Sequence, residues 1–411
     1  MVSTKSTKVE AYRMAEEPLR VLVIPSSDYL GHPFPQRHNH LFERIHVGRE
    51  FEVHVIRFNI FGKPRLNSRC VIHEIPLELR IRKTALYYLA NVLSYTSEIL
   101  SIVRRESIDV VFAGNLLPPL TFSLINSLRE RRIPVVFDLQ DHYPTSATGY
   151  IVDVDSIAGR VFKGLFEVMT RYLIGKADVV TVPGVALALY ARRVGARGIN
   201  IVPNGISEHF LVKHDGSKVR RALSYDEGDI VVGYIGSIEF WLNMESLIKA
   251  ITKAKGKGLP VKLLIVGGKL QSGYPRKVKE WLSRYGVEGV TTWLNFIPHD
   301  RVPEYIAAMD IATIPFNVSN PTAYYAAPNK LWEYLSQGVT VAATPIPEIL
   351  SYKHLDCLHI IRNTEDYITI FRRKERCWSS RTQQLLQSML WSHSATKLKR
   401  ILRKLANPKI N

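Results

Sequence analysis

A short segment in the C-terminal half of this 411-residue chain combines residue types that are suited to binding an anion. It reads APNKLWEYLSQG over residues 327–338 and contains Pro328, Asn329, Lys330 and Glu333. Proline fits the first turn of a helix and glycine fits its C-terminal cap, so the pattern predicts a helix of about ten residues. The free N–H groups at its start and the charge of Lys330 would suit a phosphate. The alternative is a surface salt bridge between Lys330 and Glu333, which are three residues apart.

Two glycine-containing turns in the same half could also approach a phosphorylated ligand. The run VGYIGSI over residues 232–238 predicts a strand that ends at Gly236 and Ser237, whose backbone N–H groups would then face a diphosphate. The run VPNG places Asn204 and Gly205 at a turn between the two halves of the chain. Both patterns are also common in ordinary turns, so each is weak alone.

Polar residues in the N-terminal half follow two apolar runs. Residues 26–37 form a long loop after the first run, and its residues of interest are Gly31, His32, Gln36 and Arg37. A second run ends in FDLQDHYPT and carries Asp138, Asp141 and His142. Side chains at the carboxyl ends of strands point into the ligand cleft of an open α/β sheet. The alternative is that the two acids cap the next loop and helix.

Candidate metal ligands are present but poorly spaced. His32, His38 and His40 lie close in sequence, yet His38 and His40 are two residues apart and cannot share one helical face. Asp153 and Asp155 resemble a DxD metal motif, but their position suits a loop and a helix cap better. We therefore expect no bound metal.

Cysteine usage and hydropathy bear on the compartment. The three cysteines, Cys70, Cys357 and Cys377, are odd in number and form no CxxC pair, which predicts neither a disulfide framework nor a structural zinc site. Such thiols fit a reducing cytosol. The first 18 residues lack the apolar core of a signal peptide. The most apolar stretch, residues 84–103, has too many polar groups for a spanning helix, so we expect a cytoplasmic protein.

Short apolar runs alternate with helix-length segments along the whole chain. In the first half they lie at residues 19–27, 51–60, 109–115, 134–141 and 177–184. The pattern restarts at residues 230–237, 261–268, 290–297, 311–316, 339–344 and 357–361. This alternation predicts parallel sheets with helices on both faces, and the length fits two domains. The fold class is therefore α/β, with two Rossmann-like doubly wound domains facing across a cleft.

The predicted boundaries follow from the restart of this pattern. We expect a tail over residues 1–18, an N-terminal domain over 19–200 and a C-terminal domain over 201–378. The segment 379–411 is basic and helical in pattern, and we expect it to cross back to the N-terminal domain.

The segment PNKLWEYLSQG resembles the donor-binding signature of glycosyltransferase family 4, which reads roughly P-x-K-x-x-E-Y-x-x-x-G. QRHNH over residues 36–40 and the D-x-x-D of residues 138–141 are similar to a teichuronic-acid-type subset of that family. The resemblance implies the GT-B fold and places on Glu333 the acid that hydrogen-bonds the donor ribose. The first acid of the family's E-x7-E pair is replaced here by Tyr325.

The resemblance also implies roles for the other residues. The donor, a UDP-, GDP- or ADP-sugar, would contact Asn204, Gly205, Gly236, Ser237, Pro328, Asn329, Lys330 and Glu333. The acceptor, a glycan, a lipid-linked sugar or another molecule, would contact Gly31, His32, Gln36, Arg37, Asp138 and His142. The catalytic residues would be Asp141, Lys330 and Glu333. Family members retain the anomeric configuration and require no metal or permanently bound cofactor.

The net charge of +18 favours anionic partners and leaves other interpretations open. Arg80, Arg82 and Lys83 precede an apolar segment, and the tail 397–409 carries Leu398, Ile401, Leu402 and Leu405 at helical spacing. Both segments suit peripheral contact with an anionic membrane, unless they are core helices with solvated charges. One alternative function is a nucleotide-sugar epimerase of GT-B fold. Another is a nucleic-acid-binding protein, which we do not expect because no reading module is recognisable.

Overall fold

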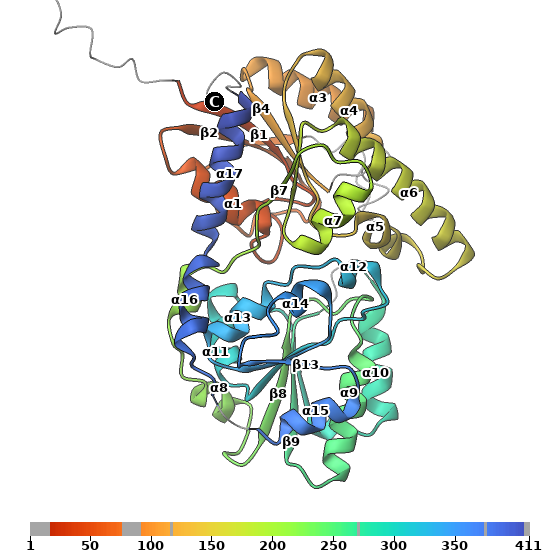
Figure 1. Ribbon diagram of the computed structural model, residues 1–411, viewed down its shortest axis with the longest axis vertical. Helices are drawn as coiled ribbons and strands as arrows, with labels where there is room; N and C mark the ends of the chain where they lie inside the picture. Colours follow the sequence, from red (N-terminus) through yellow and green to blue (C-terminus); the bar gives the residue numbers. More distant parts are fainter. Residues whose placement is uncertain (1–16, 76–91, 116–117, 269–271, 374–375, 407–411) are drawn as a thin grey trace, which may run out of the picture.

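The computed structural model describes residues 17–75, 92–115, 118–268, 272–373 and 376–406, which form two domains, each built on a parallel sheet (Figure 1). The first sheet has seven strands in the order β3-β2-β1-β4-β5-β6-β7. Its strands are β1 (Leu19–Ile24), β2 (Phe51–Phe58), β3 (Val71–Ile75), β4 (Val110–Gly114), β5 (Val135–Asp138), β6 (Val179–Val182) and β7 (Ile199–Ile201). The helices of this domain are α1 (Arg37–His46), α3 (Val92–Arg105), α4 (Pro118–Glu130), α5 (Tyr143–Ile151), α6 (Ile157–Lys176) and α7 (Val185–Arg193).

The second sheet has six strands in the order β10-β9-β8-β11-β12-β13. They are β8 (Ile230–Ile235), β9 (Val261–Val266), β10 (Thr291–Leu294), β11 (Ile311–Ile314), β12 (Thr340–Ala343) and β13 (Leu358–Ile360). The α-helices are α8 (Ser217–Ala222), α9 (Met244–Gly256), α10 (Tyr274–Arg284), α11 (Val302–Ala307), α12 (Pro321–Tyr324), α13 (Lys330–Ser336), α14 (Pro347–Ser351) and α15 (Thr364–Phe371). The short 3₁₀ helices are η1 (Glu208–Leu211), η2 (Glu288–Val290) and η3 (His299–Arg301).

The strand order confirms the predicted doubly wound α/β class. Strand β1 pairs with both β2 and β4, and β8 pairs with both β9 and β11, so each sheet reverses its order beside its first strand. Ligands of open α/β sheets bind at the carboxyl ends of strands beside such a reversal. Residues that follow β5 of the first sheet and β8 of the second line one common cavity, so these strand ends face each other.

Alternate residues of the central strands bury their side chains on opposite faces of the first sheet, because successive residues of a strand point in opposite directions. Leu22 and Ile24 pack with side chains of α3, α4, α6 and α7. Val21 and Val23 pack with α1 on the other face. Residues of both faces are fully buried, which explains the continuous apolar runs of the sequence.

The chain ends on the N-terminal domain. After α16 (Ser380–Ser388), helix α17 (Trp391–Ala406) lies beside α1 in the upper domain of Figure 1. Leu398 and Leu402 of α17 are fully buried against this domain, and Ile401 and Leu405 are partly buried there. Of the two interpretations of this tail, the structure therefore supports the core helix, because these four residues pack against the N-terminal domain and are not available to a membrane.

Two further expectations concern segments elsewhere in the chain. Arg80, Arg82 and Lys83 lie outside the described residues, as does most of the apolar segment after them. Within the described ranges, no helix is long and apolar enough to cross a membrane.

The expectation that the chain has no disulfide was wrong, since Cys357 and Cys377 are bonded. The segment after α15 returns along the sheet, where the N–H of Cys377 donates to the carbonyl of Gly338 (2.9 Å). This return brings together two cysteines that are 20 residues apart in the sequence. The absence of a CxxC pattern does not exclude a disulfide between such distant positions. Cys70 is a buried free thiol, and burial, reinforced by Glu43, raises its pKa to about 12.

Candidate functional site

A cavity of about 380 Å³ lies between the two domains. Strand ends and loops of the N-terminal domain line one wall, through Phe34, Pro35, Gln36, Arg37, His40, Gln140 and Asp141. The C-terminal domain lines the other, through Ile235, Gly236, Ser237, Val266, Phe296, Ile297, His299, Val302, Ala327, Asn329, Lys330 and Glu333. The junction and the start of α17 complete it, through Asn204, Gly205, Ile206, Ser207, Phe210 and Trp391. Most of the residues singled out in the sequence therefore meet in one place.

The helix predicted at residues 327–338 is shorter than expected. Helix α13 has seven residues, with Asn329 as N-cap, and Pro328 precedes the cap instead of lying in the first turn. The N–H groups of Trp332 and Glu333 already donate to the carbonyl of Asn329, at 2.9 and 3.1 Å. The helix start therefore offers fewer free donors than predicted. Gly338 ends the helix with φ of +64°, as a C-terminal glycine cap requires.

Lys330 lies across the glycine turn at the end of β8. A β-carbon on Gly236 would be 2.6 Å from Lys330 Nζ, and Gly236 has φ of +142°. The ammonium also lies over the ring of Tyr234, 5.7 Å from its centroid. Only glycine permits this approach, so the VGYIGSI turn and the PNKLWEY segment form one wall of the cavity.

Lys330 and Glu333 are half-buried and lack a close ion pair with each other in the described part of the chain. Burial lowers the pKa of Lys330, and the charge of Glu333 opposes this shift only in part. Burial likewise raises the pKa of Glu333, against the influence of Lys330 and His209. Beside them, Oδ1 of Asn329 is buried without a hydrogen-bond partner. This wall thus offers a cation and an acid that are not paired with each other, and an amide oxygen that can still accept a hydrogen bond.

In the turn after β8, one of the two backbone donors expected to face a diphosphate is already used. The N–H of Gly236 donates to the carbonyl of Val266 (2.9 Å), so it is not free to bind a phosphate. Ser237 lines the cavity, and Tyr234 donates from its hydroxyl to the Ser237 carbonyl (2.8 Å). Gly267 also belongs to this turn, because a β-carbon there would be 2.0 Å from the Gly236 carbonyl oxygen. The glycine pair GG at residues 267–268 was the sequence signal for this contact.

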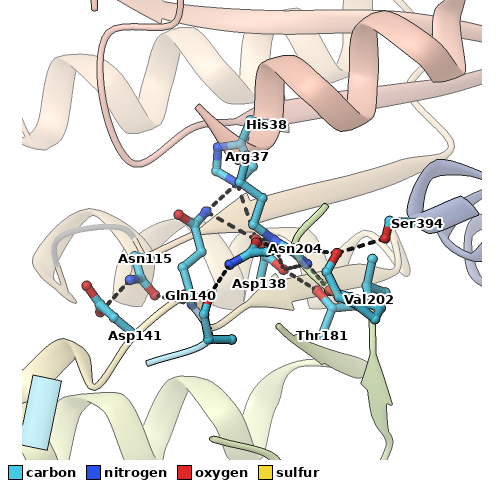
Figure 2. Close-up of polar contacts among 12 residues, drawn as sticks. Arg37, His38, Asn115, Asp138, Gln140, Asp141, Thr181, Val202, Asn204 and Ser394 are labelled. Atoms are coloured by element: carbon cyan, nitrogen blue, oxygen red, sulfur yellow. Dashed lines mark hydrogen bonds and ion pairs between the residues drawn. The ribbon is translucent and has the colours of Figure 1, made fainter. Parts of the chain in front are cut away.

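On the opposite wall, Arg37 forms a buried ion pair with Asp138 (Figure 2). Arg37 Nε donates to Asp138 Oδ2 at 3.0 Å, and Thr181 Oγ1 donates to Oδ1 at 2.7 Å. Gln140 Nε2 donates to Oδ2 at 3.1 Å. Asp138 is fully buried and is not among the residues that line the cavity. In this conformation it orients Arg37, and it is not exposed to a ligand.

The same arginine connects the N-terminal domain to the junction. Arg37 Nη1 donates to Asn204 Oδ1 (2.9 Å), and Nη2 donates to the Val202 carbonyl (2.8 Å). Asn204 Nδ2 in turn donates to the carbonyl of Ala327, just before α13 (2.9 Å). These successive hydrogen bonds connect the first residue of α1 to the segment that carries Lys330.

Asp138 is held ionised despite its burial. Burial alone would raise its pKa, but Arg37 and His38 outweigh that effect and hold the pKa well below the usual range. His38 Nε2 lies 3.5 Å from Asp138 Oδ2 and contacts Gln140 Nε2 at 2.6 Å. Hydrogen bonds and ion pairs to the charged form stabilise this carboxylate, so its role in this structure is to hold neighbouring side chains in place.

Asp141 is the acid of the N-terminal wall that does line the cavity. Asn115 Nδ2 donates to its Oδ1 at 2.7 Å (Figure 2), and Ser146 Oγ donates to the same oxygen at 3.1 Å. Burial raises its pKa to about 6, although both hydrogen bonds oppose the shift. Such an acid can accept a proton near neutral pH.

The remaining candidates of the N-terminal domain lie outside the cavity, with the exception of Gln36. His142 is buried, stacks on Tyr325 and donates or accepts at Thr145 Oγ1 (2.9 Å). His32 bonds to the Phe34 carbonyl (2.9 Å), and its pKa is lowered to about 4 by burial. Gly31 approaches Asp28, which accepts from its N–H (2.9 Å). Gly31 and His32 therefore shape the loop before Gln36, and His142 precedes α5.

At the junction, Gly205 allows the C-terminal segment to pass close by. A β-carbon on Gly205 would be 2.7 Å from the carbonyl oxygen of Met389. The N–H of Ile206 donates to the carbonyl of Met389 (2.9 Å), and the N–H of Trp391 donates to the carbonyl of Ile206 (3.1 Å). The Asn-Gly pair thus forms the turn between the domains, and its glycine also leaves room for the C-terminal segment that returns to the N-terminal domain.

Three aromatic side chains of the cavity form a cluster that the sequence did not indicate, although His40 was considered there as a metal ligand. The rings of His40 and Trp391 stack, with centroids 4.8 Å apart and planes 7° from parallel. The ring centroid of His299 in η3 lies 6.0 Å from that of His40, so this contact connects the two domains. They come from three distant segments, and no local pattern signals their meeting.

The described residues contain no group of three or more His, Cys, Asp or Glu side chains that could hold a metal ion. Asp153 Oδ1 accepts from the N–H of Asp155 (3.0 Å), and Ser156 caps α6 through the N–H of Gly159 (2.9 Å). The DVD tripeptide is therefore a loop that precedes a capped helix, as its alternative interpretation predicts.

Two family models match separate parts of this chain. One is described as a glycosyl transferase 4-like domain and matches residues 36–205, and the other, glycosyl transferases group 1, matches residues 229–370. No curated protein has a matching sequence.

Solved structures share the whole architecture. Sucrose-phosphate synthase from Thermosynechococcus elongatus has a TM-score of 0.76 at 13% identity, over 95% of this chain and 100% of that one. HepE from Anabaena, solved with UDP-glucose, has a TM-score of 0.68 at 16% identity, over 94% and 100%. WaaG, a glycosyltransferase involved in lipopolysaccharide biosynthesis, has a TM-score of 0.61 at 16% identity, over 95% and 100%. At these identities the likeness concerns the fold.

The chain has the two-domain fold of GT-B glycosyltransferases. The two matched family models, found in the corresponding domains, support a glycosyltransferase.

Proposed function

We propose that this chain transfers a sugar from a nucleoside diphosphate sugar to an acceptor in the cavity between its domains. The observation that carries the proposal is the pair Lys330 and Glu333, half-buried on one cavity wall without a close ion pair between them. Partly buried charges are costly unless a partner satisfies them. A diphosphate would satisfy Lys330, and ribose hydroxyls would satisfy Glu333, as the resemblance to family 4 implies.

The proposed chemistry divides between the two walls. Negative charge grows on the leaving diphosphate in the transition state, and the Lys330 ammonium would stabilise it. Asp141 on the facing wall would orient the acceptor hydroxyl and receive its proton. Asn329, whose Oδ1 lacks a partner, supplies a further polar contact for the donor.

The finer features of the proposal come from the resemblance. They are retention of the anomeric configuration and charge compensation by Lys330 in place of a protein-bound metal. Uridine sugars are the first donors to test, since HepE was solved with UDP-glucose, followed by GDP- and ADP-sugars. The acceptor class extends to glycans and lipid-linked sugars.

The test is a thermal-shift panel of nucleotides and nucleotide sugars, followed by product analysis. A donor at about 100 times its Kd should add roughly 2.7 kcal/mol to the free energy of unfolding. Transfer should persist in EDTA, and chromatography should show a glycosylated acceptor with the anomer of the donor. No stabilisation by any nucleotide would overturn the proposal, and a free epimerised sugar without acceptor product would identify an epimerase.

A further inference from the structure

Helix α6 carries an apolar stripe on the side that faces solvent. Ile157, Val161, Leu165 and Val168 expose 76%, 68%, 52% and 68% of their side chains. Their spacing of four, four and three residues places them along one side of the helix. Single exposed aliphatic residues are ordinary, but a row of four along three turns marks an interaction surface.

The opposite side of the helix is anchored in the N-terminal domain. Phe166, Thr170 and Leu173 are buried there, and Phe166 packs edge-to-face on Tyr143 of α5, with centroids 6.2 Å apart. Figure 1 shows α6 at the outer margin of the domain. The stripe is therefore held on an anchored helix at the edge of the protein, where a second molecule can approach it.

Two charges of opposite sign lie along one flank of the stripe. Arg160 and Glu167 are seven residues apart and therefore occupy the same position of successive heptads. Within the described residues, neither is paired with an opposite charge. Lys163 does not belong to this flank, because a helix turns about 100° per residue and this places Lys163 on the side opposite to the stripe. A flank with one cation and one acid can complement a reversed copy of itself.

Two copies of the helix fit each other in one antiparallel register. When Ile157 lies opposite Val168 of a second copy, Val161 lies opposite Gly164 of that copy, and two-fold symmetry repeats both contacts. Gly164 is exposed, and a β-carbon placed on it would meet nothing within 4 Å. The glycine therefore leaves room for the valine of the second copy.

The same register also matches the flanks of the stripe. Arg160 lies opposite Glu167 of the second copy, and on the other flank Ala158 lies opposite Leu165. Charged residues beside the seam of two paired helices set their orientation. In a parallel pair the flank with the charges would face the apolar flank instead, so the charges select the antiparallel arrangement. The two copies of Arg171 lie at opposite ends of the pair and do not face each other.

We propose that α6 joins two copies of this chain in an antiparallel, two-fold symmetric dimer. The stripe forms the apolar seam, and two reciprocal ion pairs between Arg160 and Glu167 fix the register. About three turns of helix from each copy make a small interface, so the association is reversible and depends on concentration. This pairing is a property beyond sugar transfer and does not depend on the identity of donor or acceptor.

Sedimentation equilibrium of the full chain over a range of concentrations tests the apolar seam. The original chain should show a monomer–dimer equilibrium. Val161→Glu should raise the dimer dissociation constant about tenfold or more, because it places a charge against Gly164 of the second copy. The matched control is Val212→Glu, which changes a valine of similar exposure (59%) after η1 and should dimerise as the original chain does.

Exchange of the two charges tests the register. Arg160→Glu alone places two acids opposite each other at both ends of the seam, and Glu167→Arg alone places two cations there. Each should raise the dissociation constant about tenfold. An equal mixture of the two variants should form mixed dimers, and the double variant Arg160→Glu, Glu167→Arg should dimerise as the original chain does. Lys163→Glu, on the opposite side of the helix, is the control and should change nothing.

The possible outcomes separate this dimer from other uses of the stripe. A monomer at every concentration would overturn the proposal, as would a dimer that neither Val161→Glu nor Arg160→Glu weakens. Failure of both the mixture and the double variant to restore dimers would reject the antiparallel register. Sedimentation of a monomeric chain with lipid vesicles, reduced by Val161→Glu, would assign the stripe to a membrane instead.

Discussion

The ring of Tyr325 lies nearly parallel to the ring of His142, with centroids 5.2 Å apart and planes 15° from parallel. Tyr325 precedes α13 in the C-terminal domain, and His142 follows β5 in the N-terminal domain. Arg193 Nη2 donates to the Tyr325 hydroxyl at 2.9 Å. The position where the family resemblance places an acid is therefore an aromatic contact between domains and does not line the cavity.

We predict that Tyr325 contributes to stability and not to donor binding. Tyr325→Ala should lower the free energy of unfolding by about 1–3 kcal/mol, because it removes the stack on His142. Tyr325→Phe keeps the ring and should cost less than about 1 kcal/mol. Urea titration measures both. Tyr325→Glu should not raise donor affinity, and a clear increase in calorimetry would contradict this assignment.

Glu333 is predicted to bind the nucleotide. Glu333→Ala should weaken nucleotide binding by about 1.5–3 kcal/mol, the typical contribution of a hydrogen bond to a charged group. Isothermal titration calorimetry measures the change. Glu280→Ala, which removes an exposed acid of α10 (58% exposed side chain), is the control and should leave affinity unchanged. An equal affinity for Glu333→Ala and the control would reject the role of Glu333.

Lys330 is predicted to act more strongly in the transition state than in the ground state. Lys330→Met keeps the packing of the side chain against Gly236 and Tyr234 but removes its charge. The charge of the leaving diphosphate increases during transfer, so kcat should fall more than KM rises. Steady-state kinetics separate the two parameters. A rise in KM with unchanged kcat would mean that Lys330 binds donor and transition state equally.

Much of the fold could be predicted because buried parallel strands give continuous apolar runs. The two strands that were missed show the limit of that signal. Strand β3 (VIHEI) is an edge strand with exposed and polar residues, and β7 has three residues. Neither presents an apolar run long enough to distinguish it from a loop.

The site was predictable where one segment carried several of its residues, as in residues 327–338. It was not predictable where contacts join distant segments. The position of Asp138 at a strand end predicted a contact with the acceptor. In the structure its carboxylate instead pairs with Arg37, which is 101 residues away in the sequence. The stack of His40 on Trp391 depends on the return of the C-terminal helix, which no local spacing specifies.

Asp141 predicts a pH dependence of activity. Its pKa is raised to about 6 by burial, so activity that needs the carboxylate should rise with pH through about 6. Stability should change in the opposite sense. The folded state holds the proton more tightly than the unfolded state, whose pKa is near 3.9, so stability falls as pH rises from about 4 to 6.

Ser146→Ala tests this assignment. The substitution removes a hydrogen bond to the carboxylate, so the pKa of Asp141 should rise and the acidic limb of the activity profile should move to higher pH. Ser351→Ala, at an exposed serine of α14, is the control. An acidic limb that stays in place in both variants would assign it to another group.

The ion pair of Arg37 with Asp138 supports the last prediction. Arg37→Met should cost about 3–5 kcal/mol, because it leaves a fully buried carboxylate without its cation. The double variant Arg37→Met, Asp138→Asn removes both charges and should recover part of that loss. The pKa of Asp138 is lowered in the folded state, so the ionised pair stabilises the protein above the unfolded pKa near 3.9, and this contribution is lost as pH falls below it. Urea titrations at pH 7 and about pH 3 should therefore show a smaller difference between the original chain and the double variant in acid. Asp138→Asn is measured alone as well, and a loss in the double variant equal to the sum of the two single losses would mean that Arg37 and Asp138 act independently.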